Sequence, residues 1–467
     1  MSDTVAKRSP KSEAMVAAGA KGRALMGGTA AMRAAGTTYL PMFEAESAEA
    51  YKPRLAASWL FNGYRKTVRD MTGRVFSAPV ELGEDADSVF DDWGMNIDLQ
   101  GRDLSTFARE VFQDALSGPG IGYILVDAPR REGVITRAQA QAMNLRPYLT
   151  HLRAEDVLGW RSETINEKPT LTQIRIFETV TEQDPDDEFA DIDMEQVRVM
   201  TRGEGVVTVR LYRKNGKTGK WFQHGEEYAT GLDEITVAPF YASRSGFFTG
   251  EPLLDDLADT NVAHWQSQSD QRNILHVARV PILHATGRTE GDKPIVIGAG
   301  MAVSSMDVNA RLEWVEHTGA AIAAGRQDLK DLEFQMETHG LQLLVAQPGG
   351  QSATGETLDA QKETSQLAMT ADALKDTLEM ALHWMGVYAG YSDMWPGVSV
   401  NTDFGAGTMT AQEMSVLLSA VNTGNMSRET FLAECARRGM VRPDLDVEKE
   451  VDAIGTDSEG LMTDGTI

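Results

Sequence analysis

Apolar side chains recur at helical spacing along two stretches in the second half of the chain. In residues 321–344, Leu329, Leu332 and Met336 lie three or four positions apart, and charged residues occupy the other positions. Residues 358–389 carry a longer stripe of the same kind. This periodicity predicts two long amphipathic helices. The segment between them contains Pro348 and several glycines, so it cannot continue either helix.

A further helix and a short β segment precede this pair. Residues 252–278 form a helical pattern that the sequence Val280-Pro281 ends. One side of the predicted helix carries Leu254, Leu257, Asn261, Trp265, Arg272 and Leu275. Residues 282–318 contain short apolar runs separated by glycine, which indicates a small β insert. The order helix, β insert, helix is the main organising feature that the pattern predicts.

The first half of the chain mixes helical and strand patterns. Residues 46–76 and 101–116 favour helices, and Pro53 is expected either in the first turns of the former or at a break in it. Alternating apolar positions predict strands at 121–127, 147–152, 170–181, 197–200, 206–213 and 220–224. Residues 214–217 are typical of a tight hairpin turn. The overall pattern therefore predicts an α+β fold.

Charge and composition restrict the class of protein. The formal net charge of −25 opposes tight binding to nucleic acid and to anionic membranes, although it allows DNA to slide past. The single cysteine, Cys435, excludes an internal disulfide framework, and no apolar run is long enough to span a membrane. These features indicate a soluble intracellular product. Residues 1–35 carry a net positive charge and predict either a loosely docked tail or a contact to a neighbouring subunit or to DNA.

Three tempting chemical motifs fail on inspection. Residues 350–357 have the spacing of a phosphate-binding P-loop, but Glu356 occupies the lysine position and would repel phosphate. The acidic stretch 182–195 matches no calcium-binding loop and is expected to be a solvated loop. The histidines and Cys435 show no metal-ligand spacing. We therefore expect no catalytic residues, no cofactor and no metal, and hence no enzyme.

Several short motifs, taken in their order along the chain, resemble a known family. They are Tyr39-Leu40-Pro41, Tyr51, Arg54, Asn62, residues 120–127, Asn261, His264, Ser267, Ser269-Asp270 and residues 312–319. In this order they resemble the portal proteins of tailed bacteriophages, specifically the phage portal family catalogued as a domain of unknown function. The resemblance covers residues 39–454.

The resemblance implies a portal fold and a ring, usually of twelve copies, at one vertex of a capsid. It assigns 1–250 to an N-terminal arm and a β-containing wing, 251–281 to a first stem helix, 282–318 to a small β clip, 319–345 to a second stem helix, 346–357 to a tunnel loop, 358–390 to a long wing helix and 391–467 to a helical crown.

The resemblance also implies sites and partners. The stem and the tunnel loop would line a channel for double-stranded DNA, with Gln347, Gln351, Ser352, Thr354, Arg326, Lys330 and Lys362 as candidate channel residues. The clip would dock partner proteins through Arg288, Lys293 and Trp314. The implied partners are further copies of the chain, the terminase large subunit, a head–tail adaptor, and the major capsid and scaffolding proteins, but no membrane. The protein would lie in the virion at the portal vertex, and in the host cytoplasm during assembly.

Two other classes of protein remain open. A different head–tail connector ring would share the helices and the acidity but would not need a β insert inside its stem. An acidic metal-dependent hydrolase would use the carboxylates of residues 182–195.

Overall fold

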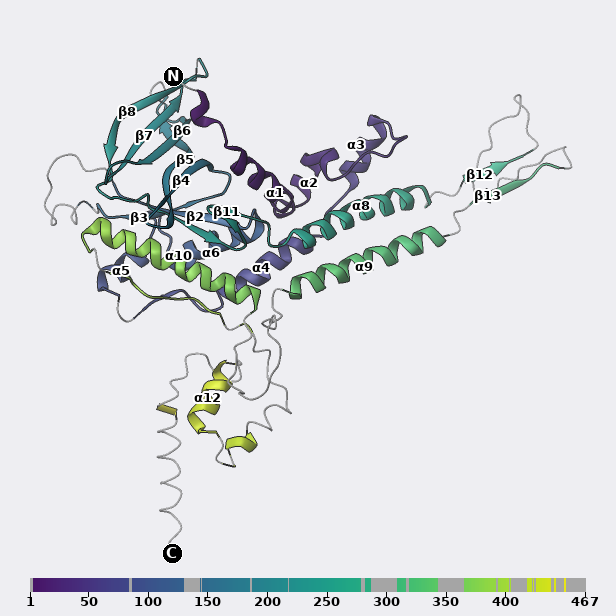
Figure 1. Cartoon of the computed structure of the whole chain (residues 1–467). Helices are drawn as coiled ribbons and strands as arrows, with labels where there is room; N and C mark the ends of the chain where they lie inside the picture. Colours follow the sequence, from purple (N-terminus) through teal and green to yellow (C-terminus); the bar gives the residue numbers. More distant parts are fainter. Residues whose placement is uncertain are drawn as a thin grey trace, which may run out of the picture. The chain divides into compact units, whose positions relative to one another are not determined.

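The computed structural model describes residues 3–83, 86–129, 143, 145–184, 187–216, 218–278, 282–286, 309–315, 319–342, 365–391, 394–402, 404, 418–421, 423, 426–437, 441 and 449–450. The chain forms two compact units, Met1–Val400 and Asn401–Ile467. The second unit contains α12 (Arg428–Arg437), which Ser427 caps and in which Cys435 is buried. No helix among the described residues is both long and apolar enough to cross a bilayer. The first unit has an α+β fold (Figure 1).

The N-terminal segment is part of the core, so the expectation of a loosely docked tail is wrong. The short helix η1 (Asp3–Ala6) leads to α1 (Pro10–Met26), α2 (Gly28–Ala35) and η2 (Gly36–Thr38). The side chains of Met15 and Leu25 are buried. A Cβ added at Gly22 would lie 2.4 Å from the carbonyl oxygen of Ser117, so a glycine is required where α1 meets its neighbours. The packing of small residues against the core explains the alanine-rich and glycine-rich composition of this segment.

The predicted helix 46–76 is two helices, and the break is not at Pro53. Helix α3 (Ala48–Ala57) continues through Pro53, and α4 (Gly63–Val75) begins after Asn62. The Asn62 side chain accepts a hydrogen bond from the backbone N–H of Arg65, which caps α4. The cap, rather than the proline, therefore determines where the new helix begins.

A three-stranded antiparallel sheet of order β3-β2-β9 lies at the centre of the unit. Strand β2 (Ile121–Asp127) pairs with β3 (Tyr148–Leu152) and β9 (Val237–Tyr241), and α6 (Leu104–Ser117) and α10 (Gln366–Ala389) contact β2 and β9. Alternate β2 side chains face the larger sheet, while Gly122 lies against α6. Both faces of β2 are covered, which explains its nearly continuous apolar sequence. Around this layer lie α5 (Ser88–Gly94) and the strand pairs β1 (Glu81–Leu82) with β14 (Val398–Ser399) and β10 (Arg244–Gly246) with β11 (Thr249–Gly250).

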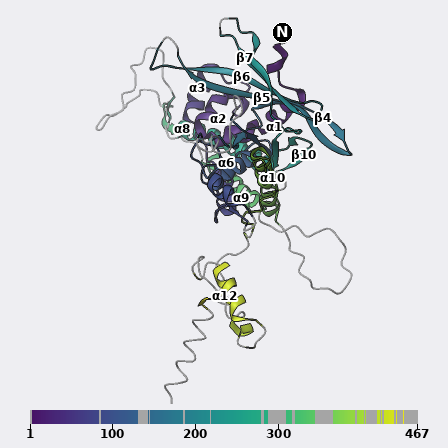
Figure 2. The same cartoon turned by 90° about the vertical axis from the view of Figure 1, so that its left-hand side faces the viewer.

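The larger sheet is an antiparallel meander in the order β4-β5-β6-β7-β8 (Figure 1), and Figure 2 shows β4 to β7 from another side. The predicted acidic loop 182–195 is largely strand, because β5 and β6 pair as far as Gln183 and Asp191. The hairpin turn predicted at 214–217 is longer than expected, since Lys214 pairs with Trp221. The strands are β4 (Val157–Ile165), β5 (Lys168–Gln183), β6 (Asp191–Arg202), β7 (Val207–Lys214) and β8 (Trp221–Ala229).

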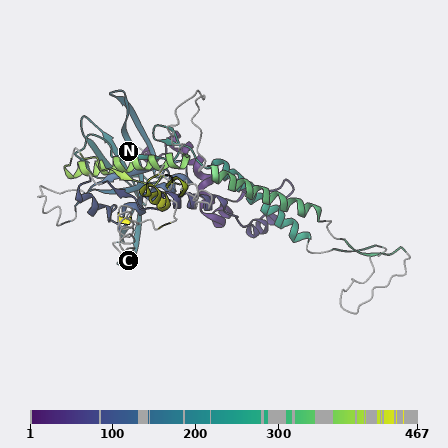
Figure 3. The same cartoon turned by 90° about the horizontal axis from the view of Figure 1, so that it is seen from below.

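Two antiparallel helices flank the predicted β insert, as Figures 1 and 3 show. Helix α8 (Asp255–Ala278) precedes strand β12 (Ile282–Ala285), and β13 (Leu312–Val315) precedes α9 (Ala320–Gln342). Strands β12 and β13 pair from Ile282 with Val315 to Ala285 with Leu312, so the two ends of the insert are held together. Ser365 caps α10, which therefore begins at Gln366 and not at residue 358 as predicted.

Candidate functional site

The pair α8–α9 is the feature on which the candidate functional surfaces lie. The helices contain 24 and 23 residues, which corresponds to lengths of roughly 35 Å. Gly325 allows close contact, since a Cβ there would lie 2.2 Å from Oε1 of Gln271. The Gln271 side chain in turn donates to the carbonyl oxygen of Ile322 over 2.9 Å. Small residues and a side chain–backbone hydrogen bond thus hold α9 against α8.

The face of α9 that the periodicity marked as apolar is turned inward. Leu329 and Met336 are buried, and Leu332 is half-buried. A Cβ added at Gly63 of α4 would lie 2.8 Å from the sulfur of Met336. Helix α9 therefore also packs on α4. This arrangement agrees with the predicted packing face.

The opposite face of α9 is exposed and carries the two candidate channel residues that lie on this helix. Arg326 and Lys330 are exposed, and neither forms an ion pair with a described residue. Phe334 and Leu341 are also exposed, at 70% and 59% of their surfaces. The sequence pattern predicted an outward face of charged residues. The exposed Phe334 and Leu341 make this face partly apolar. Large apolar side chains on such a surface are typical of contact with another molecule.

Polar contacts between α8 and α9 centre on a buried histidine. His264 is 1% exposed, and its Nε2 lies 3.4 Å from Oε1 of Glu333. Its Nδ1 has no hydrogen-bond partner among the described residues. Burial lowers the pKa of His264, although Glu333 favours the protonated form. One turn further along, the hydroxyl of Ser267 donates to Asp328 over 2.5 Å. The contact thus favours a neutral imidazole beside an acidic group.

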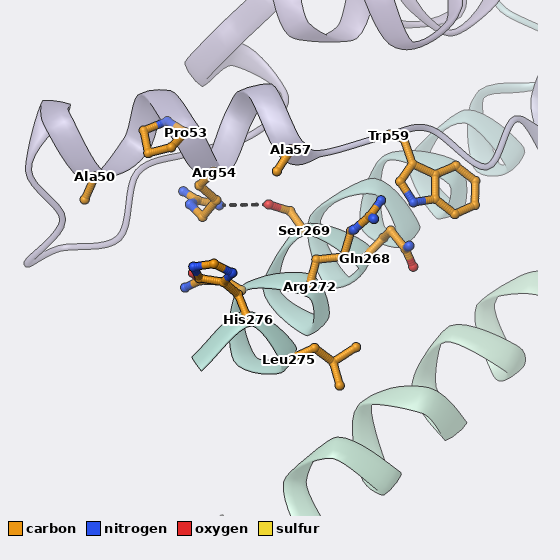
Figure 4. Close-up of a pocket in the computed structure, with 11 residues that line it drawn as sticks. Ala50, Pro53, Arg54, Ala57, Trp59, Gln268, Ser269, Arg272, Leu275 and His276 are labelled. Atoms are coloured by element: carbon orange, nitrogen blue, oxygen red, sulfur yellow. Dashed lines mark hydrogen bonds between the residues drawn. The ribbon is translucent and has the colours of Figure 1, made fainter. Parts of the chain in front are cut away.

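A groove of 770 Å³ lies between α3 and α8 (Figure 4). Figure 4 shows Arg54 from α3 directed toward Ser269 of α8, over 3.4 Å. Arg54 also donates to Glu46, which lowers the pKa of that carboxyl group. Arg272 and His276 line the groove from α8, and Arg272 is exposed. Arg272 and Leu275, which were predicted on one side of this helix, both line the groove. At this level of α8 the buried residue is Gln271.

The residues that carried the family resemblance fix α3 and α4 onto α8. The side chain of Asn261 accepts from the backbone N–H of Tyr64 over 2.9 Å and donates to the carbonyl oxygen of Phe61 over 2.8 Å. Arg54 contacts Ser269 and lies 3.7 Å from Asp270. Glu46, which neutralises Arg54, was not among the residues singled out in the sequence. Glu46 lies eight residues before Arg54, and neither residue belongs to a predicted apolar stripe. The sequence therefore gives no periodic signal for this pair.

Of the other candidate residues, the structure describes Trp314. Trp314 lies in β13, opposite Leu283. The remaining candidates lie outside the described residues: Arg288, Lys293, Gln347, Gln351, Ser352, Thr354 and Lys362. Among the described residues, no three His, Cys, Asp or Glu side chains are grouped so as to hold a metal ion.

Comparison with known proteins highlights the same segment. A family model described as Domain of unknown function (DUF4055) matches residues 252–389, which include α8, β12, β13, α9 and α10. The sequence has no match among curated proteins. The match therefore spans the helical pair, its β insert and α10.

Three solved structures are similar to the chain at low identity. They are the neck of the native GTA particle computed with C12 symmetry (12% identity, TM-score 0.37, 79% of this chain and 88% of that chain), the virion of the native gene transfer agent (GTA) particle (11%, 0.36, 78% and 85%), and the neck of the empty GTA particle computed with C6 symmetry (10%, 0.38, 78% and 86%).

Proposed function

We propose that the chain is a structural subunit of a phage-like particle and that it forms a portal ring at the head–tail vertex. The observation that carries the proposal is the order α8, β12–β13 insert, α9. Two antiparallel helices of nearly equal length present an outward face with Arg326 and Lys330, and a β insert emerges from their common end. This order is the one that the portal resemblance requires of a stem and a clip. The similar neck and virion structures belong to the same class of assembly, but the proposal rests on the features of this chain.

In this proposal the ring contains twelve copies, and double-stranded DNA passes along its axis during packaging and ejection. The net charge of −25 per chain suits that role, since an acidic wall repels the duplex and forms few lasting phosphate contacts. Arg326 and Lys330 would act as local contacts on α9, and the segment 346–357 would project into the channel. The ring would lie in the virion, and assemble in the host cytoplasm.

The β insert is proposed as the docking surface for partner proteins. These are the terminase large subunit during packaging and the head–tail adaptor afterwards, with Trp314, Arg288 and Lys293 as contact residues. The major capsid and scaffolding proteins would contact the rest of the ring. The antiparallel pairing of β12 with β13 supports this role, because it anchors residues 286–311 at both ends. We propose a structural protein without catalytic activity.

A connector ring is the second candidate function. The β insert distinguishes the two, because a connector ring would not need an insert between its helices. Residues 287–308 are replaced by a short Gly-Ser linker, which keeps β12 and β13. The variant and the intact chain are examined by negative-stain microscopy and tested for retention of a tagged terminase large subunit. A portal predicts rings for both proteins and loss of terminase binding in the variant. Undiminished terminase binding by shortened rings would contradict the docking role, and a globular monomer would contradict both ring proteins.

A further inference from the structure

The hairpin β5–β6 extends beyond both neighbouring strands of its sheet. Strand β4 pairs with β5 no further than Ile176, and β7 pairs with β6 no further than Gln196. Residues 178–184 and 187–195 therefore form a two-stranded projection, called here the hairpin extension. Two ion pairs tie its strands to β7: Glu182 with Arg213, and Glu195 with Lys214. An isolated two-stranded ribbon is marginally stable in water, so such a projection gains from contact with another surface.

The end of the hairpin extension combines an exposed aromatic side chain with acidic neighbours. Phe189 is 91% exposed, the largest exposed fraction of any large apolar side chain described. Asp187, Glu188 and Asp191 surround it in the sequence, and none forms an ion pair with a described residue. Aromatic residues, including phenylalanine, are enriched at protein interfaces relative to the rest of the surface. A surface complementary to this tip would combine an apolar area with positive charge.

A groove with these properties lies on the same sheet, beside Gln173 and Arg175 in the middle of β5. It has a volume of 620 Å³ and is called here the basic groove. Trp160 supplies an aromatic wall, and Gly159 allows Ser9 to lie within 2.9 Å of its Cβ position. The cations that line it are Lys7, Arg8, Arg161 and Arg175, against one acidic residue, Glu13.

The cations of the basic groove are not neutralised within the described part of the chain. Arg175 donates to the carbonyl oxygens of Thr4, Val5 and Lys7 at 2.8–2.9 Å, and Arg8 donates to Ser12 and to carbonyl oxygens. Burial and the nearby Arg161 lower the pKa of Arg175. Four positive groups without a carboxylate partner are unusual on a chain of net charge −25. An incoming acidic group would relieve this repulsion.

The tip cannot fill the groove of its own chain. Arg175 and Gln183 lie on one continuous strand, and their separation is roughly 27 Å at the rise of an extended strand. The turn that carries Phe189 lies beyond Gln183 and points away from the groove residues. The two complementary surfaces can therefore meet only between separate molecules.

We infer that the acidic, Phe189-bearing tip of the hairpin extension docks into the basic groove of a neighbouring copy of this chain. The inference rests on the proposed ring, because a closed ring needs two different surfaces on every subunit that fit each other head to tail. Phe189 would lie against Trp160, within reach of the Arg161 guanidinium, while Glu188 and Asp187 would meet Lys7 and Arg161. The meander sheet would thus contribute to ring closure in addition to the helical pair.

Charge reversal tests the inference on the full-length chain. Arg161→Glu and Glu188→Arg each place like charges opposite each other, and both residues are exposed, so the fold is preserved. The double variant R161E/E188R restores opposite charges, since the tip of one copy meets the groove of the next. Mass photometry gives the chain concentration at half-assembly for each protein. Each single variant is expected to raise it by about tenfold or more, and the double variant to return close to the wild-type value.

Two further variants provide the controls. Phe189→Ser removes the anchor and should also weaken assembly, whereas Met95→Ser removes another highly exposed apolar side chain and should not. Normal assembly of both single charge variants, or failure of the double variant to restore it, would overturn the inference and leave the proposed ring standing. A wild-type chain that stays monomeric at every concentration would instead contradict the proposed ring and the inference together.

Discussion

Arg54 donates to both carboxylate oxygens of Glu46, at 2.7 and 2.6 Å, and the two side chains are almost completely buried. The same guanidinium contacts Ser269 of α8 and the carbonyl oxygen of Pro41, and lies 4.2 Å from the ring centre of Phe43. The Arg54–Glu46 pair therefore joins α3 and the segment before it to α8. The orientation of α3 on α8 depends on this pair.

Arg54→Ala is expected to destabilise the protein by about 1–3 kcal/mol, because it leaves the Glu46 carboxylate without its hydrogen-bonding partner. Urea denaturation followed by tryptophan fluorescence measures the change in the free energy of unfolding. Lys375→Ala, which removes a long, half-buried pair with Glu379 on α10, is the control and should change the free energy of unfolding by less than about 0.5 kcal/mol. Equal effects of the two substitutions would contradict the structural role of Arg54.

The helical pair is expected to lose stability in mild acid through His264. Burial lowers the folded-state pKa of His264 below its usual value, so its contribution is fully present above the unfolded pKa of about 6.5. The contribution is lost as the pH falls from there through the folded pKa, because the unfolded chain binds the proton more readily. The melting temperature should therefore drop between pH 7.5 and 5.5, and His264→Asn should reduce that drop. An unchanged pH dependence in the variant would assign it to other groups.

Met336 and Lys330 test the assignment of the two faces of α9. Met336→Asp buries an unpaired charge against α4 and should cost more than about 3 kcal/mol, whereas Lys330→Ala should be close to neutral. Leu332→Asp should fall between them, since Leu332 is only half-buried. Thermal unfolding and ring assembly are measured for all three. The assignment is reversed if Lys330→Ala disrupts assembly and Met336→Asp does not.

Two glycines on different helices test the docking of the N-terminal segment. A Cβ at Gly22 meets the Ser117 carbonyl oxygen at 2.4 Å, so Gly22→Ala should destabilise by about 1–3 kcal/mol despite the better helix propensity of alanine. Gly73 on α4 has no atom within 4 Å of its Cβ position, and Gly73→Ala should stabilise by about 0.5–1 kcal/mol. The sign of the change in melting temperature distinguishes the two. Stabilisation by Gly22→Ala would show that α1 is loosely held.

The sequence pattern predicted those elements whose apolar spacing reflects one buried face. Leu329 and Met336 on α9, and the run in β2, are of this kind, and the structure has the corresponding helix and strand. The β insert was predicted from short apolar runs separated by glycine, between two helical patterns. These parts follow from local burial, which leaves a repeating trace in the sequence.

Other parts depend on contacts between residues far apart in the sequence. Gly22 packs against Ser117, and nothing in the alanine-rich composition of residues 1–35 distinguishes a buried helix from a tail. The acidic residues 182–195 read as a loop because charge hides the strand pairing of Thr181 with Asp193. Arg54, Asn261 and Ser269 were noticed through the family resemblance, but the hydrogen bonds that they form across helices have no sequence periodicity.

The central claim is that α8, the β12–β13 insert and α9 form the channel unit of a closed ring. Cryo-electron microscopy of the purified full-length chain, combined with mass measurement of the particles, tests it most directly. The account predicts a ring of cyclic symmetry, with twelve copies, whose axial hole is lined by the α9 face that carries Arg326 and Lys330. A monomer, or a ring in which this face of α9 lies away from the axis, would contradict the account.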